Sequence, residues 1–326
     1  MINSIQADYG PLVEYLKAVP FDVSRKTLYS PTELYEGFQP GQTETPQNYF
    51  DHQIYEHFMA KGKIPRDIKE SVARTTHDHG MKIGLNDFIQ AHNILRFVGV
   101  MGGHALLRTD QMYRQIVYLS KQLTERGFCM ISGGGPGAME ATHLGAWMAG
   151  YADSDVEDAL RILSAGPSFS DAAWLSTAFE VRSKYPQTQY ESLGIPTWLY
   201  GHEPPTPFAT HIAKFFENSI REDIILTLPF GGIIYTPGSA GTMQEIFQNA
   251  VQNHYLSFGF SSPMIFLGSQ FWTDEMPVYP LLNGLIETGK YKNLSLTLTD
   301  DSEVVMQKLL DFQNHIESHP EDYKPH

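Results

Sequence analysis

Two glycine-rich segments of the chain have the composition of anion-binding turns. Residues 132–141 read SGGGPGAMEA, and residues 236–245 read TPGSAGTMQE. Each follows a short apolar run and precedes a helix-like segment, so each is expected to lead from a strand into the N-terminus of a helix. Glycine lets backbone N–H groups approach an anion without a Cβ in the way, and a helix N-terminus adds about half a positive charge. The two turns together predict a site for a phosphate-bearing ligand.

Glu245 and Arg221 are the charged side chains best placed to act on such a ligand, although each also has a purely structural interpretation. Glu245 ends the second turn, but Thr242 and Glu245 also match the S/T-x-x-E capping box of a helix start. Arg221 follows Glu217 by four residues, which suits a surface ion pair worth a few tenths of a kcal/mol. The run PGSAG contains more glycine than a cap requires, which favours a ligand-binding turn.

The first turn does not fit a dinucleotide-binding dehydrogenase. The run GGGPG at residues 133–137 lacks the GxGxxG spacing, and no acidic residue ends the next strand to hold a ribose. Glu140 lies in the first turn of the expected helix, where the helix dipole alone stabilises an acid. We therefore expect Glu140 to contact a ligand and not to act as a catalyst.

The elements around these turns alternate between strands and helices from about residue 91 to the end of the chain. Strands are expected at residues 94–100, 127–131, 231–236, 263–268 and 294–301, and helices at residues 109–126, 138–149, 210–226 and 302–316. This βαβα order predicts a doubly wound parallel sheet of Rossmann-like α/β type. Residues 150–195 are expected to be irregular.

Residues 1–90 show no such alternation and are expected to form a helical appendage, separate from a nucleotide-binding catalytic domain at residues 91–326. Within the appendage, His77 and His79 lack a clear third ligand nearby, so a polar loop is favoured over a metal site.

The amino-acid composition excludes several classes of binding partner. The chain has 326 residues, 42% of them hydrophobic, and a formal net charge of -14. An acidic protein of this kind is not expected to bind nucleic acid or an anionic membrane, which need a broad basic face. One cysteine, Cys129, excludes a disulfide framework, and the N-terminus has no signal-peptide pattern. The expected location is the cytoplasm.

The motifs carry a family resemblance. PGSAGTMQE resembles the PGGxGTxxE signature of the LOG proteins, nucleotide phosphoribohydrolases often mislabelled as lysine decarboxylases, and GGGPGAMEA resembles the glycine turn before it. The resemblance runs from about residue 94 to residue 316. It implies that Arg221 and Glu245 are catalytic. Two departures stand out: Ser239 replaces the second signature glycine, and Glu222 replaces the basic residue that usually follows the arginine.

The resemblance implies a hydrolase acting on the N-glycosidic bond of nucleoside 5′-monophosphates, releasing a free base and ribose 5-phosphate. Its substrates would be cytokinin riboside monophosphates or purine and pyrimidine nucleotides in general. It implies no metal and no organic cofactor, and a homodimer or higher homo-oligomer. The alternative is a non-catalytic nucleotide or cofactor carrier on the same fold. The expected binding residues are Gly133, Gly134, Gly135, Gly137, Met139, Glu140, Gly238, Ser239, Gly241 and Thr242.

Overall fold

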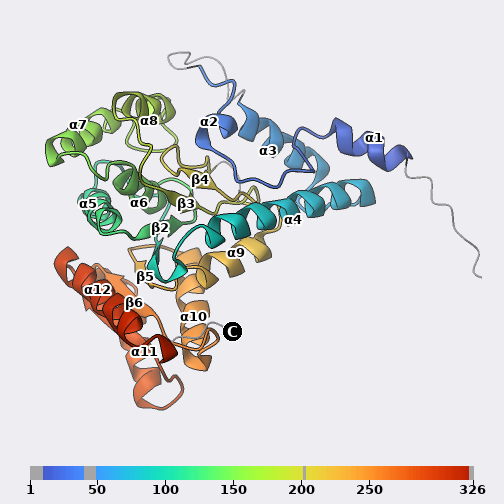
Figure 1. The fold of residues 1–326 in the computed structure, drawn as a ribbon. Coiled ribbons are helices and arrows are strands. Elements are labelled where there is room, and N and C mark those ends of the chain that lie inside the picture. The colour runs from blue at the N-terminus through green and yellow to red at the C-terminus, as the bar shows by residue number, and fades with distance from the viewer. Residues whose placement is uncertain (1–9, 40–48, 201–202, 323–326) are drawn as a thin grey trace, which may run out of the picture.

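The computed structural model describes residues 10–39, 49–200 and 203–322, and it contains one sheet of seven parallel strands. The spatial order is β4-β3-β2-β1-β5-β6-β7 (Figure 1). The strands are β1 (Phe97–Met101), β2 (Cys129–Ser132), β3 (Ser192–Gly194), β4 (His211–Ile212), β5 (Gly232–Tyr235), β6 (Pro263–Leu267) and β7 (Ser295–Thr299). The predicted doubly wound parallel sheet is confirmed.

The strand order reverses between β1 and β5. From β1 the chain adds β2, β3 and β4 on one side, and then returns to place β5 against the other side of β1. Val98 is in register with Gly232, and Met101 with Tyr235, so the carboxyl ends of β1 and β5 lie next to each other. Ligands of doubly wound proteins bind in the crevice at this point of reversal. The second glycine turn follows β5 directly, and the first follows β2.

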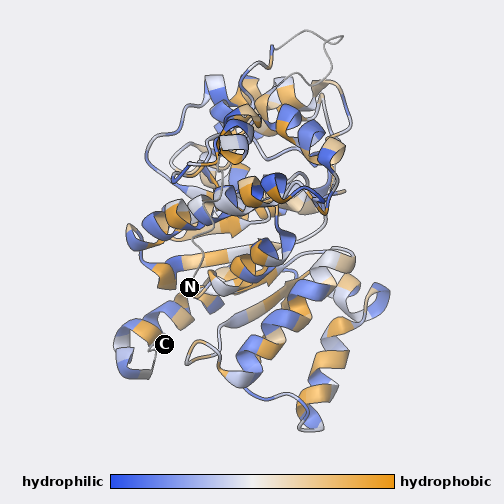
Figure 2. Cartoon of the chain, turned by 90° about the vertical axis from the view of Figure 1, so that its right-hand side faces the viewer, coloured by the Kyte–Doolittle hydropathy of each residue, from blue (hydrophilic) through white to orange (hydrophobic). Residues whose placement is uncertain are grey.

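Alternating side chains along each strand divide the core into two layers. Val98 and Val100 face a cluster that includes helices α5 (Gln111–Glu125), α6 (Ala138–Trp147), α7 (Asp153–Leu163), α8 (Ala173–Lys184) and α12 (Ser302–Ser318). Phe97 and Met101 face a second cluster with α9 (Asn218–Thr227), α10 (Ala240–Tyr255) and α11 (Val278–Glu287). In Figure 2 the helices carry both hydrophilic and hydrophobic residues, as expected for helices with one buried face. Short helical turns are η1 (Ile94–Arg96), η2 (Phe271–Glu275) and η3 (Pro320–Asp322).

The N-terminal region is helical and packs on the second cluster. It contains α1 (Gly10–Ala18), α2 (Pro31–Leu34), α3 (Phe50–Lys61) and α4 (Ile68–Gln90). Side chains of α3 and α4, such as Phe58 and Met81, belong to the same buried cluster as the strands. A buried ion pair joins Asp51 to Lys214, with 2.6 Å between Oδ1 and Nζ. The division of the chain near residue 90 stays a prediction.

Two expected elements differ from the structure. Residues 150–195 are not irregular, because α7, α8 and β3 lie there, and α7 buries the helically spaced residues Val156, Ala159, Leu160 and Leu163. Residues 210–226 are not one helix. They begin with β4, which pairs with β3, and α9 starts only at Asn218. The intervening Phe215 and Phe216 are buried, so packing overrides the helical pattern.

Within the described ranges, every helix is too short or too polar to cross a membrane.

Candidate functional site

A cavity of about 440 Å³ lies at the carboxyl ends of β1, β2 and β5. It is lined by the turns after these three strands, the start of α6, helices α9 and α10, and the segment after β3. The lining includes Gly102, Gly103, His104, Gly133, Gly135, Met139, Pro196, Thr197, Tyr200, Glu203, Arg221, Glu222, Leu226, Ser239, Ala240, Gly241, Thr242, Gln244, Glu245 and Gln248. The structure thus brings together Arg221, Glu245 and most of the predicted binding residues.

The second glycine turn supplies the N-terminus of α10 to this cavity. Ser239 is the N-cap of α10, and its φ of -119° is one that serine adopts without strain. Gly238 is required, because a Cβ there would lie 2.1 Å from the Thr242 hydroxyl oxygen. Ala240 and Gly241 open the helix at the cavity wall, where the first N–H groups of a helix have no partner within it.

The start of α10 also decides between the two interpretations of Glu245. Thr242 is the third residue of the helix and not its cap, so Glu245 does not form a capping box with it. Its carboxylate instead faces Arg221 of α9, with 3.8 Å between Glu245 Oε1 and Arg221 Nη1. The two side chains are 15% and 12% exposed.

Arg221 is held in place from two sides. Its Nε donates to the carbonyl of Ile195 at 2.8 Å. Its guanidinium lies against Gly133, where a Cβ would approach Nη2 to 2.4 Å, so the first glycine turn leaves room for the arginine. The expected surface pair with Glu217 does not form, since the Glu217 carboxylate accepts from Ser219 instead.

Burial raises the pKa of Glu245 from its usual 4.5 to about 7; Arg221 lowers this pKa, and the neighbouring Glu222 raises it. A carboxyl group with a pKa near 7 takes up and releases protons at neutral pH, which is the property of a general acid or base. Strongly shifted pKa values in a cavity are typical of functional sites.

Two further carboxylates line the cavity. Glu222 accepts hydrogen bonds from Tyr200 Oη at 2.9 Å, from Gln244 Nε2 at 3.0 Å and from Asn218. Glu203 lies 3.4 Å from Nδ1 of His104. Among the described lining residues, Arg221 is the single lysine or arginine. The cavity therefore offers one permanent cation and several hydrogen-bond acceptors. Neither Glu203 nor His104 belongs to a recognisable motif, which is why the sequence did not point to them.

Part of the first glycine turn is directed into the protein. The Gly134 N–H donates to Ser132 Oγ at 3.1 Å, and Ser132 Oγ lies 2.8 Å from Nε2 of His143. Burial lowers the pKa of His143 to about 3, so this histidine is neutral and only supports the turn. Gly137 has a φ of +70°, and a Cβ there would approach the Gly103 carbonyl oxygen to 2.4 Å. Of the predicted binding residues, Gly134, Gly137, Glu140 and Gly238 do not line the cavity.

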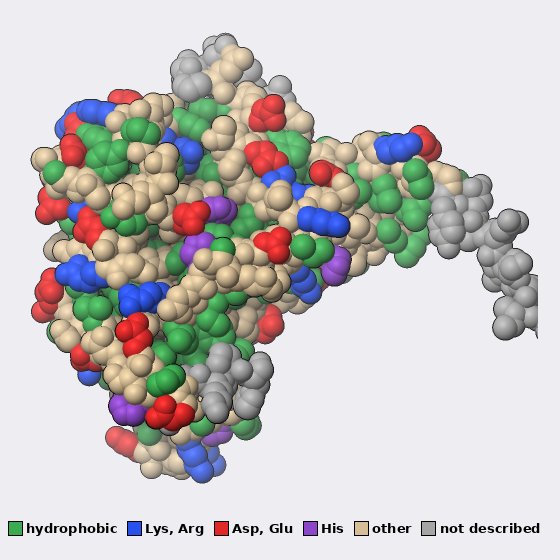
Figure 3. All heavy atoms as spheres, in the orientation of Figure 1, with side chains coloured by type: hydrophobic (Ala, Val, Ile, Leu, Met, Phe, Trp, Pro, Cys, Tyr) green, Lys and Arg blue, Asp and Glu red, His purple; other side chains and the backbone are tan. Residues whose placement is uncertain are grey.

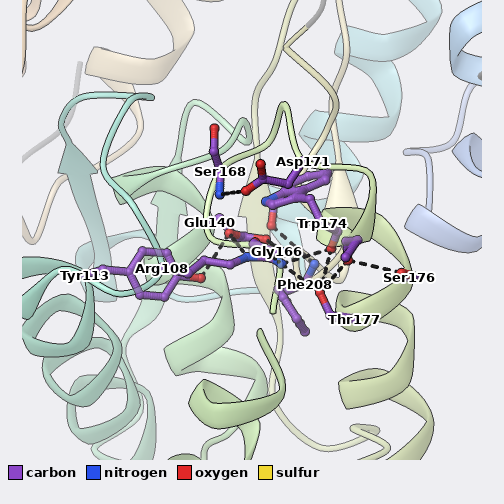
Figure 4. A network of polar contacts seen from close by, with 12 residues as sticks. Arg108, Tyr113, Glu140, Gly166, Ser168, Asp171, Trp174, Ser176, Thr177 and Phe208 are labelled. Atoms are coloured by element: carbon purple, nitrogen blue, oxygen red, sulfur yellow. Dashed lines mark hydrogen bonds and ion pairs between the residues drawn. The ribbon is translucent and has the colours of Figure 1, made fainter. Parts of the chain in front are cut away.

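Glu140 has a structural partner that the sequence does not reveal. Its carboxylate is buried and accepts from Arg108 Nε at 2.9 Å, from Arg108 Nη2 and from Tyr113 (Figure 4). Nη1 of Arg108 also donates to the carbonyls of Gly166 and Trp174. Arg108 therefore ties the first turn of α6 to Gly166, which precedes α8, and to the first turn of α8 itself. The two residues lie 32 positions apart, so no local pattern links them.

We expect Glu140→Gln to lower the free energy of unfolding strongly. The side chains of Arg108 and Glu140 are each 1% exposed, so the substitution leaves a buried guanidinium without its counterion. Breaking such a pair costs about 3–5 kcal/mol. Urea denaturation measures the loss. The matched control is Glu157→Gln, which breaks the exposed pair with Arg114 and is expected to change stability by about 1 kcal/mol or less. Equal effects of the two substitutions would contradict the prediction.

Comparison with protein-family models finds no match, and comparison with curated proteins finds none either. Among solved structures, the chain is similar to a molybdenum cofactor binding protein from the phototrophic bacterium Rippkaea orientalis. The identity is 14%, the TM-score is 0.44, and the match covers 67% of this chain and 96% of that one. It is also similar to the Moco carrier protein of Chlamydomonas rheinhardtii, with 16% identity, a TM-score of 0.39, and 66% and 97% coverage. The resemblance to LOG proteins stays a prediction.

Proposed function

We propose that the cavity binds a nucleoside 5′-monophosphate and that Arg221 and Glu245 hydrolyse its N-glycosidic bond. The observation that carries this proposal is the position of Glu245. Its carboxyl group, with a pKa of about 7, lies in a cavity beside an arginine and next to the N-terminus of α10. The resemblance of the two glycine turns to those of LOG proteins agrees with this assignment.

The phosphate would bind at the start of α10. Ser239, Ala240 and Gly241 line the cavity there, and a helix N-terminus favours a negatively charged group. Arg221 would bind and orient the nucleotide. One permanent cation together with one helix N-terminus suits a single phosphate better than a di- or triphosphate. Glu203 and Glu222 would accept hydrogen bonds from N–H or O–H groups of the base and ribose, because ionised carboxylates are acceptors only.

In the proposed reaction, water attacks the anomeric carbon C1′ while the bond from C1′ to the base nitrogen breaks. Positive charge builds on the ribose ring, as in glycoside hydrolysis, and an ionised Glu245 stabilises it or takes a proton from the attacking water. The departing base takes up a proton, and the products are the free base and ribose 5-phosphate. No step requires a metal or an organic cofactor.

The charge of the protein also limits the kinds of molecule that it can bind. The net charge of -14 disfavours a nucleic acid. On the face shown in Figure 3, acidic and basic side chains are interspersed and do not form a broad basic patch. We therefore propose a small molecule as the ligand.

A non-catalytic nucleotide or cofactor carrier is the second candidate. The observation that favours it is that many polar groups in the cavity, notably Glu203, Tyr200, Glu222 and Gln244, have no part in breaking a bond. Groups of this kind hold and orient a ligand whether or not it is cleaved. The cavity volume of about 440 Å³ is also within the range of ordinary ligand sites.

Turnover of a nucleotide panel separates these two functions. The protein is incubated with AMP, GMP, CMP and UMP, and with the matching nucleosides, and free base is measured by chromatography. We expect base release from at least one monophosphate and much less from its nucleoside, because loss of the phosphate removes the contacts that position the sugar. Equal turnover of nucleoside and nucleotide would contradict the phosphate site. Binding of a monophosphate without base release would favour the carrier.

We expect Ser239→Gly to preserve or raise hydrolysis. The extended backbone of Ser239 does not need a glycine, and its side chain makes no capping hydrogen bond, so binding by backbone N–H groups would survive the change. The measurement is kcat/KM with the best nucleotide of the panel. A strong loss of activity would show that the serine hydroxyl itself is needed, and the backbone model of the phosphate site would then be wrong.

A further inference from the structure

Asp78 lies in the middle of α4, in the N-terminal region, and not in a polar loop as the sequence indicated. Its side chain is 3% exposed. Across more than 130 positions, its Oδ1 accepts from the Phe216 N–H at 3.1 Å and its Oδ2 from the Glu217 N–H at 2.8 Å. The two oxygens of one carboxylate therefore hold two successive N–H groups just before α9.

A buried chain of hydrogen bonds supports this carboxylate. Nδ1 of His77 lies 3.0 Å from Asp78 Oδ1, and Nε2 of His77 lies 2.8 Å from the Tyr29 hydroxyl oxygen. The arrangement is satisfied when His77 carries its proton on Nδ1 and accepts from Tyr29 at Nε2. The neighbouring histidine therefore orients the Asp78 carboxylate.

Aromatic packing holds the same segment. The Phe216 ring stacks on Trp198 with 4.4 Å between centroids, and it lies 4.7 Å from Phe21 and 5.0 Å from His77. Phe21 and His77 both belong to the N-terminal region. The residues before α9 are therefore packed against segments of the chain that are distant from α9 in sequence.

This segment sets the position of the arginine in the cavity. Glu217 is the N-cap of α9 and makes no capping bond with its own side chain. The Arg221 N–H donates to the Glu217 carbonyl at 3.4 Å, which is the first hydrogen bond of the helix. This bond links Arg221 directly to Glu217, whose N–H binds Asp78. A carboxylate at a helix N-terminus also interacts favourably with the helix dipole.

We propose that Asp78 is a positioning residue for the site: it fixes the start of α9 and thereby holds Arg221 opposite Glu245. This inference rests on the proposed function for its meaning in catalysis. The proposal assigns a role to the N-terminal helices, because α4 would help to fix the position of Arg221 in the cavity. Without these helices, the sheet domain would hold Arg221 less firmly.

The experiment compares Asp78→Ala and Asp78→Asn with the wild-type protein. The first readout is the pKa of Glu245, followed by carbon NMR of its side-chain carboxyl. The charged or titratable groups acting on it are Arg221, Glu222 and Tyr235. If Arg221 moves away, its lowering effect weakens, and the pKa of Glu245 rises above about 7. The second readout is AMP affinity by calorimetry, and the third is kcat/KM for base release. Misplacing a group by 1 Å can cost about a hundredfold in rate, so we expect a loss of about tenfold or more for Asp78→Ala.

Asp78→Asn is expected to recover part of each readout, because its amide oxygen can still accept from one of the two N–H groups. The matched control is Asp67→Ala at the start of the same helix. Asp67 is the N-cap of α4, where its carboxylate accepts from the Lys69 N–H at 2.9 Å and pairs with the Lys69 side chain, away from residues 216–217. The control is expected to lower the melting temperature and to leave the pKa of Glu245 unchanged.

An unchanged pKa of Glu245 and an unchanged AMP affinity in folded Asp78→Ala would overturn the proposal. If that variant does not fold, the same result in Asp78→Asn overturns it. A shift of equal size in Asp67→Ala would also overturn it, because the effect would then reflect a general loss of stability. Failure of the proposed function is distinguishable: wild-type protein would release no base, while the pKa of Glu245 would still report where Arg221 lies.

Discussion

Glu245→Gln is expected to lose base release from nucleoside monophosphates by about 10²–10⁴-fold, the usual contribution of a general acid or base. Glutamine matches glutamate in size but cannot ionise, so it neither takes a proton from water nor stabilises positive charge on the ribose. Steady-state kinetics with the best nucleotide measure the effect. AMP affinity should change much less than kcat, since the proposed phosphate contacts are at the start of α10.

The same substitution should stabilise the folded protein at neutral and alkaline pH. The folded-state pKa of Glu245, about 7, lies above its unfolded value of 4.5, so the folded state binds more protons between these two pH values. The destabilising effect of the ionised carboxylate is therefore absent below about pH 4.5, grows as the pH rises, and is complete above about pH 7. Removing the charge should raise stability at pH 8 by up to a few kcal/mol and leave it nearly unchanged at pH 4.5.

Thermal unfolding at these two pH values tests the sign. Glu125→Gln is a suitable control, because Glu125 lies far from the cavity lining and keeps an ion pair with Lys121 in the wild-type protein. A Glu245→Gln protein that retains most of its activity would remove Glu245 from the mechanism. The raised pKa predicts that Glu245→Gln stabilises the protein more at pH 8 than at pH 4.5. A stabilisation that is smaller at pH 8 than at pH 4.5 would contradict it.

Arg221→Ala is expected to lower kcat/KM by about a hundredfold or more, in the range found when a single stabilising donor is removed from an active site. The lining would then have no permanent cation among its described residues to orient the nucleotide. Because Arg221 lowers the pKa of Glu245, its removal should raise that pKa further. At neutral pH more of Glu245 would be protonated, so any activity that requires the ionised form should shift to higher pH.

Arg221→Lys separates charge from geometry. Lysine retains the positive charge but lacks the Nε donor that binds the Ile195 carbonyl, so we expect an intermediate activity. Arg126→Ala serves as a surface control, since Arg126 is exposed and its side chain donates to the nearby carbonyl of Gln122. Wild-type kinetics of Arg221→Ala would exclude Arg221 from the site. A fall in kcat/KM without any change in the pH profile would contradict its coupling to Glu245.

The local patterns of the sequence were sufficient for five of the seven strands and for the two glycine turns. Strands β1, β2, β5 and β6 are short apolar runs with a glycine next to at least one end, and α5 and α12 follow 3.6-residue periodicity, so each element is encoded by neighbouring residues. The reversal of strand order follows from the βαβα alternation. The positions of β4 and α9 were not predictable in this way, because the segment between them is buried by residues distant in sequence. Phe216 packs on Trp198 and on Phe58 and His77 of the N-terminal helices.

The sequence by itself also determined which residues could carry the chemistry. The composition of the turns pointed to Ser239, Gly241 and Glu245, and the resemblance to LOG proteins pointed to Arg221. Only the tertiary structure decided what these residues and Glu140 do. Spacing along the chain leaves a capping glutamate and a cavity glutamate indistinguishable, because the difference lies in where α10 begins. Glu140 is engaged by Arg108, and α9 is anchored by Asp78, through contacts between distant segments. Burial and charge pairing depend on such contacts, so the pKa of Glu245 and the support of Arg221 exist only in the folded chain.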